Sequence, residues 1–539
     1  MKNTLLFSVA VVSCLFLGFT VYKATTKNAT NKPNIVLIMA DDLGFSDIGC
    51  YGSEIKTPNL DKLASEGMRL KQCYNNGICA PSRATLLTGQ YPHKAGIGFF
   101  NADLGLPAYQ GFLNKQSLTF GEIFQQAGYN TYLSGKWHVG NDSSKWALKR
   151  GFDRFFGFIS GASSFFDAKP ITKGSNDFFV DGNQKYYPPK DFYLTDELTK
   201  RGIGFLKDNK KSNPFFLYMA YSSPHWPLHA KPQDIAKYKG TYDIGWDSFR
   251  VLRHQNLIKL GLIDKNQKPF KDNSLPLWSS LSYDERQYWV KKMEVYAAMV
   301  DNLDQNIGQL IQYLKETEQL DNTLIVFVSD NGAEGWDFSK MTIAVPRNTG
   351  AVGTAGSNES YTKNWSQVSN MPLRSYKSTP YEGGISSPFI ARLPKTIPAN
   401  SVKEGIVHFV DFVPTFIDLT GISYPKTYNN IQSHPLAGES FAPLLRGGTW
   451  ARSTPIFYEW TGNRVVRSGK WKLISTYPKN QWALYDMEND RTETTDIAHE
   501  NPKIVAELNT AYLHWAQQNE VTEWNEQLAS KTGAAFKTN

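Results

Sequence analysis

Two apolar segments of this chain end in the same pattern, a pair of acidic or amide residues followed closely by a glycine. Residues 34–40 lead into Asp41-Asp42-Leu43-Gly44, and residues 323–329 lead into Asp330-Asn331-Gly332. Continuous apolar runs of this kind are typical of strands buried in a sheet that helices cover. Ligands of open α/β sheets bind beyond the carboxyl ends of the strands, which is where these polar residues fall.

The polar side chains at these two ends offer only oxygen ligands: Asp41, Asp42, Asp330 and Asn331. Adjacent carboxylates repel each other unless a cation neutralises them. Oxygen-only coordination favours Ca²⁺ or Mg²⁺ over zinc. We therefore predict a hard divalent cation between the two strand ends. The alternative is an ordinary strand-to-helix turn, for which Asp-Asn-Gly is also typical.

The alternation of strands and helices continues from Asn34 to about Gly421. One helix is predicted from the spacing of its apolar residues by three or four: Val300, Leu303, Ile307, Leu310 and Leu314. Such alternation predicts an α/β fold in which one large sheet is sandwiched between helices.

The pattern changes after about residue 435. Short strands are predicted within 454–459, 464–474 and 482–485, followed by a helix over 502–518. A chain of 539 residues exceeds one typical core, so about two domains are expected. The predicted division is a signal peptide or N-terminal anchor with a short linker over 1–30, a catalytic domain over 31–435, and a small α+β domain with an antiparallel sheet over 436–539.

The leader prediction follows from residues 5–22, which are largely apolar and lie between Lys2 and Lys23. We expect an exported protein, in the periplasm, with secretion or membrane anchoring as alternatives. Membrane contact is expected only if this segment stays uncleaved. Cys14 loosely fits a lipoprotein cleavage site, but apolar residues follow it, which argues against lipidation.

Two motifs carry the chemistry. Cys79-Ala80-Pro81-Ser82-Arg83 leads into Ala84-Thr85-Leu86-Leu87-Thr88-Gly89, and the segment 128–138 ends in Gly-Lys-x-His, with Lys136 and His138 two residues apart. If the strand continues that far, both side chains project on the same side. With the two acidic strand ends, these motifs resemble those of the type I, formylglycine-dependent sulfatases of the alkaline-phosphatase-like superfamily. The resemblance spans about Lys32 to Glu493 and, within the family, is closest in look to bacterial arylsulfatases.

The resemblance implies a mostly parallel sheet and a modified cysteine. A formylglycine-generating or sulfatase-maturing enzyme would oxidise Cys79 to formylglycine (3-oxoalanine), whose hydrate attacks the sulfur of a sulfate ester. One Ca²⁺ per chain would be held by Asp41, Asp42, Asp330, Asn331 and residue 79. Asp330 would accept the proton of the attacking hydroxyl.

The resemblance also assigns roles to five basic side chains. Arg83 would fix the hydrated aldehyde, and Lys136 would bridge it to a sulfate oxygen. His138 would take the proton whose loss expels sulfate from the covalent intermediate. His225, in Ser-Pro-His-Trp-Pro, and Lys377, before Glu-Gly-Gly, would protonate the leaving alcohol. The alternatives are a supporting role for His225 and a surface ion pair for Lys377.

Other features are less specific. His229 is a weaker candidate than His225, because the motif does not require it. The irregular stretch 339–370 is expected to border the substrate cleft. The stretch 233–281 is a candidate second wall, in which Trp246 and Trp278 either stack on a sugar or pack in the core.

Cysteine usage and charge narrow the class. Cys50 and Cys73 either pair or remain free, and the four cysteines lack the spacing of a zinc site. The net charge of +8 is scattered along the chain, which argues against a nucleic-acid partner.

The predicted function is therefore hydrolysis of sulfate esters to free sulfate and an alcohol. Fragments of a sulfated polysaccharide, for example algal ulvan or carrageenan oligosaccharides, are the leading substrate, and aryl sulfates are the second. Two alternatives remain open: a phosphonate or phosphate ester hydrolase of the same superfamily, and a non-catalytic protein that binds sulfated glycans.

Overall fold

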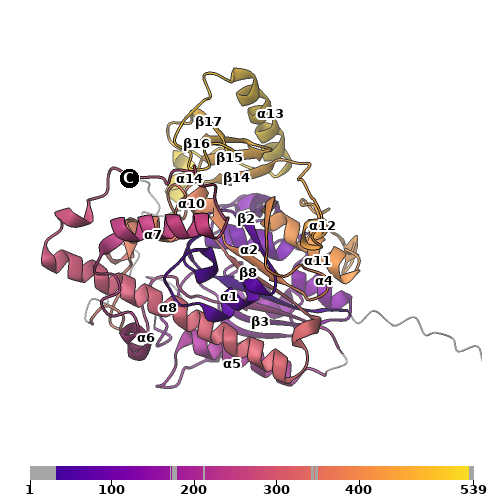
Figure 1. Ribbon diagram of the computed structural model, residues 1–539. Helices are drawn as coiled ribbons and strands as arrows, with labels where there is room; N and C mark the ends of the chain where they lie inside the picture. The colour runs from indigo at the N-terminus through magenta and orange to yellow at the C-terminus, as the bar shows by residue number, and fades with distance from the viewer. Residues whose placement is uncertain are drawn as a thin grey trace, which may run out of the picture.

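The centre of the protein is an 11-stranded mixed sheet in the order β11-β2-β10-β8-β1-β7-β3-β4-β5-β6, with β9 beside β2 (Figure 1). The computed structural model describes residues 32–169, 171–172, 179–210, 213–341, 345 and 350–532. The strands of this sheet are β1 Asn34–Ala40, β2 Met68–Tyr74, β3 Asn130–Lys136, β4 Arg154–Phe158, β5 Phe179–Asp181, β6 Gln184–Tyr186, β7 Phe215–Ala220, β8 Thr323–Ser329, β9 Ser386–Ser387, β10 Phe389–Arg392 and β11 Ser401–His408.

The middle of the sheet is parallel, as the apolar segments predict. β1 lies between β7 and β8 and pairs with both in parallel. Alternate residues of β1 enter two different cores: Val36 and Ile38 pack on one face, and Ile35 and Leu37 on the other. Because helices cover both faces, the strand is apolar at every position from Ile35 to Ala40 rather than at every second one.

The helices form the two outer layers. The face of Val36 and Ile38 is covered chiefly by α1, α5, α7 and α8, and the opposite face by α2, α4 and α11. The bounds are α1 Pro58–Ser65, α2 Cys79–Thr88, α3 Pro92–Ala95, α4 Phe120–Gln126, α5 Leu194–Lys207, α6 Pro232–Ala236, α7 Gly245–Lys259, α8 Tyr283–Glu316, α9 Thr362–Ser369, α10 Glu382–Ile385, α11 Phe412–Thr420 and α12 Ala442–Leu445.

The long helix α8 confirms the prediction from apolar spacing. Its first turn carries a capping box between Ser282 and Glu285, which satisfies backbone N–H groups at the helix start. The predicted apolar residues are all buried in the sheet-facing core: Val300, Leu303, Ile307, Leu310 and Leu314.

Residues near the C-terminus form a second, four-stranded antiparallel sheet beside the large one (Figure 1). Helix α13 packs on it through Leu508, Tyr512 and Trp515. The elements are β14 Ile456–Trp460, β15 Asn463–Ser468, β16 Trp471–Ser475, β17 Trp482–Asp486, α13 Pro502–Gln518 and α14 Glu526–Lys531, and a short hairpin, β12 Thr427–Tyr428 and β13 Ile431–Gln432, precedes them. The predicted α+β character of this region is confirmed.

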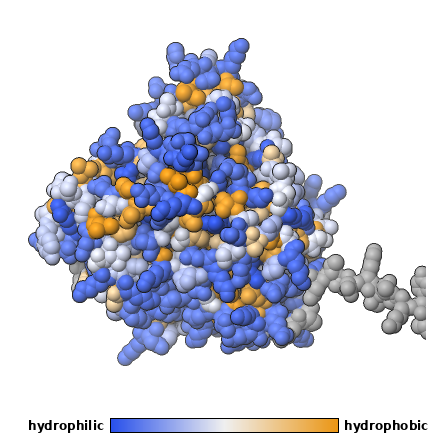
Figure 2. Space-filling model, viewed as in Figure 1, coloured by the Kyte–Doolittle hydropathy of each residue, from blue (hydrophilic) through white to orange (hydrophobic). Residues whose placement is uncertain are grey.

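The predicted leader, residues 1–30, lies outside the described residues. Within the described part of the chain, no helix has both the length and the apolar character needed to cross a membrane. Figure 2 shows hydrophobic residues on the viewed face, including some over α7, where Val251 and Leu252 are exposed.

Candidate functional site

The acidic side chains meet at the carboxyl ends of β1 and β8. These strands pair in parallel with Ala40 opposite Ser329, so the residues that follow each strand emerge side by side. The backbone N–H of Asp42 donates a hydrogen bond to Asp330 Oδ1 at 3.3 Å. Asp42 Oδ1 accepts a bond from the amide of Asn331 at 2.6 Å. The sequence prediction that the two strand ends form one site is therefore met in space.

Two buried basic side chains donate hydrogen bonds to Asp41 and Asp330. Lys136, the last residue of β3, donates to Asp41 Oδ2 at 2.7 Å. Arg83, from the second turn of α2, donates to Asp330 Oδ2 from Nε at 3.0 Å and from Nη2 at 2.7 Å. All four side chains are inaccessible to solvent. Arg83 thus contacts a carboxylate directly, and its predicted role of fixing residue 79 stays a prediction.

The close approach of β3 to β7 places Lys136. Gly135 has a φ of +132°, and a Cβ at this position would lie 1.9 Å from the carbonyl oxygen of Ala220 on β7. Only glycine permits this approach. The strand ends at Lys136, and His138 adopts a φ of +54°. The condition under which Lys136 and His138 would project on the same side, a strand that continues to His138, is therefore not met.

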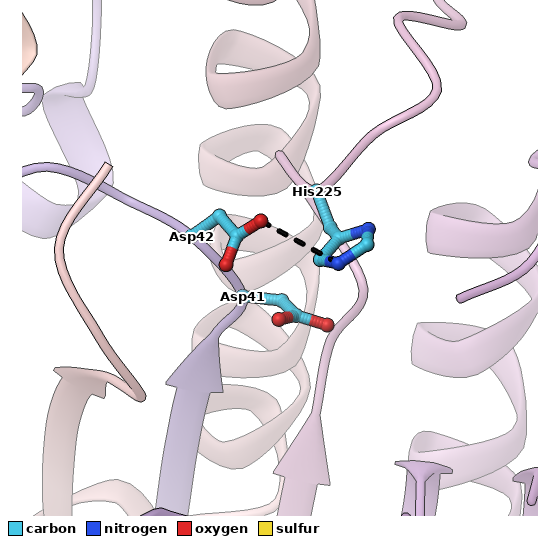
Figure 3. Close-up of side chains that lie close together, drawn as sticks. All are labelled: Asp41, Asp42 and His225. Carbon is cyan, nitrogen blue, oxygen red and sulfur yellow. Dashed lines mark ion pairs between the residues drawn. The ribbon is translucent and has the colours of Figure 1, made fainter. Parts of the chain in front are cut away.

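Lys377 and His225 complete the opposite side of the site. Lys377 Nζ lies 2.9 Å from Asp42 Oδ1 and 3.0 Å from Glu334 Oε2, and the lysine side chain is 2% exposed. The alternative of a surface ion pair for Lys377 is therefore wrong. His225 Nδ1 lies 2.6 Å from the carbonyl oxygen of Trp226, and Nε2 lies 3.5 Å from Asp42 Oδ2 (Figure 3).

The donor set fits a hard cation. One ligand atom from each of Asp41, Asp42 and His225 lies within 4.8 Å of the others, and Figure 3 shows the three side chains grouped beyond the strand ends. Among the described residues, Asp41 Oδ1 and Asn331 Oδ1 are buried oxygens with no hydrogen-bond partner. Buried acceptors normally have a partner, so these two leave room for a ligand of positive charge.

The charges point the same way. Asp41, Asp42, Asp330 and Glu334 face three permanent cations, Arg83, Lys136 and Lys377, which leaves negative charge uncompensated. Burial and the charge of Asp41 raise the pKa of Asp330. Burial also raises the pKa of Glu334, to about 7, although Lys377 opposes the shift. A divalent cation would relieve this repulsion.

Cys79 begins helix α2 and lines a cavity of about 250 Å³ above the acids. His138, His225 and Lys377 line the same cavity. Five aromatic residues also line it: Phe99, Phe100, Trp226, Trp336 and Phe338. The small pocket therefore combines the cysteine and three ionisable side chains with aromatic faces.

The structure thus brings together all the side chains that the motifs indicated. Three weaker candidates do not line the pocket above Cys79. His229 is buried with Nε2 2.8 Å from the carbonyl oxygen of Ser357, and Trp246 and Trp278 pack edge to face in the core. Cys50 and Cys73 are both free and buried. The residue that sequence reasoning missed is Glu334. Its position four residues after Asp330, in the same polar segment, was the available signal.

The stretch 339–370 lies partly outside the described residues. Its described residues near the site include Lys340, Met341 and the start of α9, which line a cavity next to the one above Cys79. None of the described residues of this stretch lines the pocket above Cys79, so the expectation that the stretch borders the substrate cleft stays a prediction.

Comparison with known proteins identifies the family. Residues 33–422 match the sulfatase family model, and residues 376–518 match the model of the N-sulphoglucosamine sulphohydrolase C-terminal region. The chain belongs to the sulfatase family. It is therefore a sulfuric ester hydrolase, and the reading as a non-catalytic binding protein loses its support.

Relatives of this sulfatase include proteins matched over nearly their whole length. An uncharacterized sulfatase of Schizosaccharomyces pombe is 33% identical over 94% of this chain and 98% of its own. An arylsulfatase of Klebsiella aerogenes is 33% identical over 77% of this chain and 92% of its own. The crystal structure of Ps i-CgsB in complex with k-i-k-neocarrahexaose is 27% identical and covers 93% of this chain and 96% of its own, with a TM-score of 0.69.

Proposed function

We propose that this sulfatase works through a formylglycine formed at Cys79, with Ca²⁺ held by Asp41, Asp42, Asp330 and Asn331. The observation that carries the proposal is the position of Cys79 in one pocket with His138, His225 and Lys377, directly above a buried acidic cluster. Oxygen ligands of this kind favour Ca²⁺ or Mg²⁺. When bound, the cation supplies positive charge to the sulfate group and lowers the pKa of the attacking hydroxyl.

The side chains divide the proton transfers between them. Asp330, oriented by the two bonds from Arg83, accepts the proton of the formylglycine hydrate as its hydroxyl attacks sulfur. Lys136 and Lys377 place positive charge beside the sulfate oxygens. His225 and Lys377, 3.4 Å apart, are in position to protonate the leaving alcohol oxygen.

Release of the second product needs a different base. The sulfated hydrate keeps one free hydroxyl, and loss of its proton re-forms the aldehyde while the C–O bond to sulfate breaks. His138 lines the pocket beside residue 79, and its Nδ1 is buried with no hydrogen-bond partner in the described structure. We therefore assign His138 as the base that accepts the proton of this hydroxyl. The covalent intermediate divides one difficult hydrolysis into two easier steps.

The substrate class that we propose is a sulfated carbohydrate, with aryl sulfates as the second candidate. Support comes from the names of similar proteins: an N-acetylglucosamine-6-O-sulfatase of Bacteroides thetaiotaomicron is 28% identical over 87% of this chain, and Ps i-CgsB was crystallised with a carrageenan oligosaccharide. The Klebsiella arylsulfatase supports the second candidate. The N-terminal apolar segment supports export to the periplasm.

The test is to produce the protein together with a formylglycine-generating enzyme and to analyse residue 79 by peptide mass spectrometry. Sulfate release from 4-nitrophenyl sulfate is measured on the same sample, beside hydrolysis of bis(4-nitrophenyl) phosphate. We expect conversion of Cys79 and preference for the sulfate ester. Cys79→Ala should be inactive, whereas Cys73→Ala, at another buried free cysteine, should keep the modification and the activity.

An active Cys79→Ala enzyme would contradict the mechanism. Preference for the phosphate diester would indicate that the enzyme is a phosphate ester hydrolase of the same superfamily.

A further inference from the structure

A second cavity, of about 740 Å³, adjoins the pocket above Cys79. The two share Trp336 and Lys377 as wall residues. The second cavity lies between the loop after β8, the start of α9 and the turn that joins β14 to β15. Its volume is within the range of small-molecule binding sites. A ligand held by its sulfate group in the first pocket can therefore extend past Trp336 into the second.

The C-terminal sheet supplies one wall of this cavity. Trp460 ends β14, and Thr461 belongs to the turn that follows. The ring of Trp460 lies 6.2 Å from that of Phe99 and 5.9 Å from that of Phe100, and both phenylalanines line the pocket above Cys79. The C-terminal region thus reaches the edge of the catalytic pocket.

The cavity wall contains four polar side chains whose polar atoms are buried and without a hydrogen-bond partner within the described chain: Thr362 Oγ1, Ser378 Oγ, Trp460 Nε1 and Thr461 Oγ1. Each of these residues is at least nine-tenths buried. An unsatisfied buried polar group costs about 1–3 kcal/mol, so four around one cavity are unusual in a folded protein. In this structure the four atoms have almost no accessible surface, so a ligand rich in hydroxyl groups would satisfy them where a side chain turns toward the cavity.

The same cavity attracts negative charge. Thr362, Lys363 and Asn364 form the first turn of α9, which carries no acidic residue, and no side-chain cap is found at that helix start in the described structure. The free N–H groups of a helix start favour an anion. Lys363 is exposed and has no ion-pair partner among the described residues, whereas Lys340 pairs with Asp337 at 3.0 Å.

We propose that this cavity is a second substrate subsite, which binds the neighbouring sugar of a sulfated oligosaccharide and holds a further anionic group of that sugar at the start of α9. The inference rests on the proposed sulfatase function. Hydroxyl groups of the sugar meet the unpartnered side chains, and its ring lies against the aromatic walls, which include Trp289 and Tyr376. The enzyme therefore prefers an oligosaccharide with at least two anionic groups to a singly sulfated ring.

The experiment measures inhibition, so that the correct natural glycan is not needed. Hydrolysis of 4-nitrophenyl sulfate, which is small enough for the first pocket alone, is inhibited with a carrageenan-derived and a heparin-derived tetrasaccharide, and with glucose 6-sulfate as the singly sulfated reference. The variant is Lys363→Ala. The matched control is Lys503→Ala, which removes an exposed lysine from α13, outside both cavities.

We expect at least one tetrasaccharide to bind about tenfold more tightly than glucose 6-sulfate in the wild-type enzyme. Lys363→Ala should weaken its binding three- to tenfold, while the Michaelis constant for the aryl sulfate changes less than twofold and Lys503→Ala changes neither. Thr461→Val, which removes one unpartnered hydroxyl without altering charge, should weaken binding of the tetrasaccharide and not of the aryl sulfate.

Equal inhibition by the tetrasaccharides and glucose 6-sulfate would overturn the subsite, as would tetrasaccharide binding that is unchanged in both variants. An enzyme that releases no sulfate from the aryl ester after conversion of Cys79 would instead contradict the proposed function. In that case, calorimetric binding of the same tetrasaccharides to the wild type and both variants tests the subsite independently.

Discussion

The buried lysine of the C-terminal sheet offers a quantitative test of how this sheet supports the active site. Lys472 Nζ lies 2.8 Å from Glu382 Oε1 and 2.6 Å from Glu493 Oε1, and all three side chains are inaccessible to solvent. Glu382 begins α10, five residues after Lys377. Glu382 keeps a second partner, Arg491, at 3.0 Å. Glu493 has no other cationic partner in an ion pair of the described structure, so it carries most of the cost of losing the lysine.

The change is Lys472→Met, which keeps the volume and removes the charge. Glu493 then either stays ionised and unpaired or takes up a proton, and the cheaper route sets the cost. Burial raises the pKa of Glu493 from its ordinary 4.5 to about 7, although the charge of Lys472 opposes the shift. In the wild-type enzyme Glu493 is therefore largely ionised at about pH 7.5 and already protonated at about pH 5.5, where it no longer needs the lysine. Breaking a buried ion pair typically costs about 3–5 kcal/mol, which is the loss expected where both glutamates are ionised.

The assay is urea unfolding at both pH values, with Lys470→Met as the control. Lys470 lies in the turn between β15 and β16 of the same sheet, and its ion pair with Asp486 is partly exposed, so we expect a loss under about 1 kcal/mol for the control. For Lys472→Met we expect a loss of about 3–5 kcal/mol at the higher pH and a smaller loss at the lower one, where Glu493 is already protonated in the wild-type enzyme. A loss that is equal at both pH values, or no larger than that of the control, would refute the reasoning.

Two further predictions concern the cation and the acid limit of stability. Chelation of the bound cation should abolish sulfate release and lower the midpoint of thermal unfolding, because the buried acids then repel one another. Added Ca²⁺ should restore both the activity and the midpoint. Activity that survives chelation would contradict the cation site. Burial, aided by the charge of Arg452, lowers the pKa of His408 to about 3 from its ordinary 6.5. The unfolded chain therefore binds a proton that the folded chain does not, so that stability is full above about pH 6.5 and falls by up to about 1.4 kcal/mol per pH unit as the pH drops toward 3. Urea midpoints between pH 7 and 5 measure this fall, which His408→Asn should reduce. If the urea midpoint of that variant depends on pH as steeply as that of the wild type, a group other than His408 is responsible.

The sequence alone was sufficient for the fold class and for most of the site. β1 is apolar without alternation from Ile35 to Ala40, and β8 from Leu324 to Val328, and a strand covered on both faces favours this pattern. Parallel strands end at one edge, so the acids after each run were expected at that edge, and the pairing of β1 with β8 makes them neighbours. The spacing of apolar residues in α8 likewise reports a local geometry, the helical repeat, which is written directly in the chain.

Only the tertiary structure decided which charged groups pair and where the pockets lie. Nothing in the local sequence indicates that Arg83 binds Asp330 rather than residue 79, that Glu334 faces Lys377, or that Trp460 of the C-terminal sheet reaches Phe100. These contacts join segments that are distant along the chain, and their geometry depends on how strands and helices pack. Local propensities are set by neighbours in sequence, whereas pairing of buried charges and the shape of a cavity are set by neighbours in space.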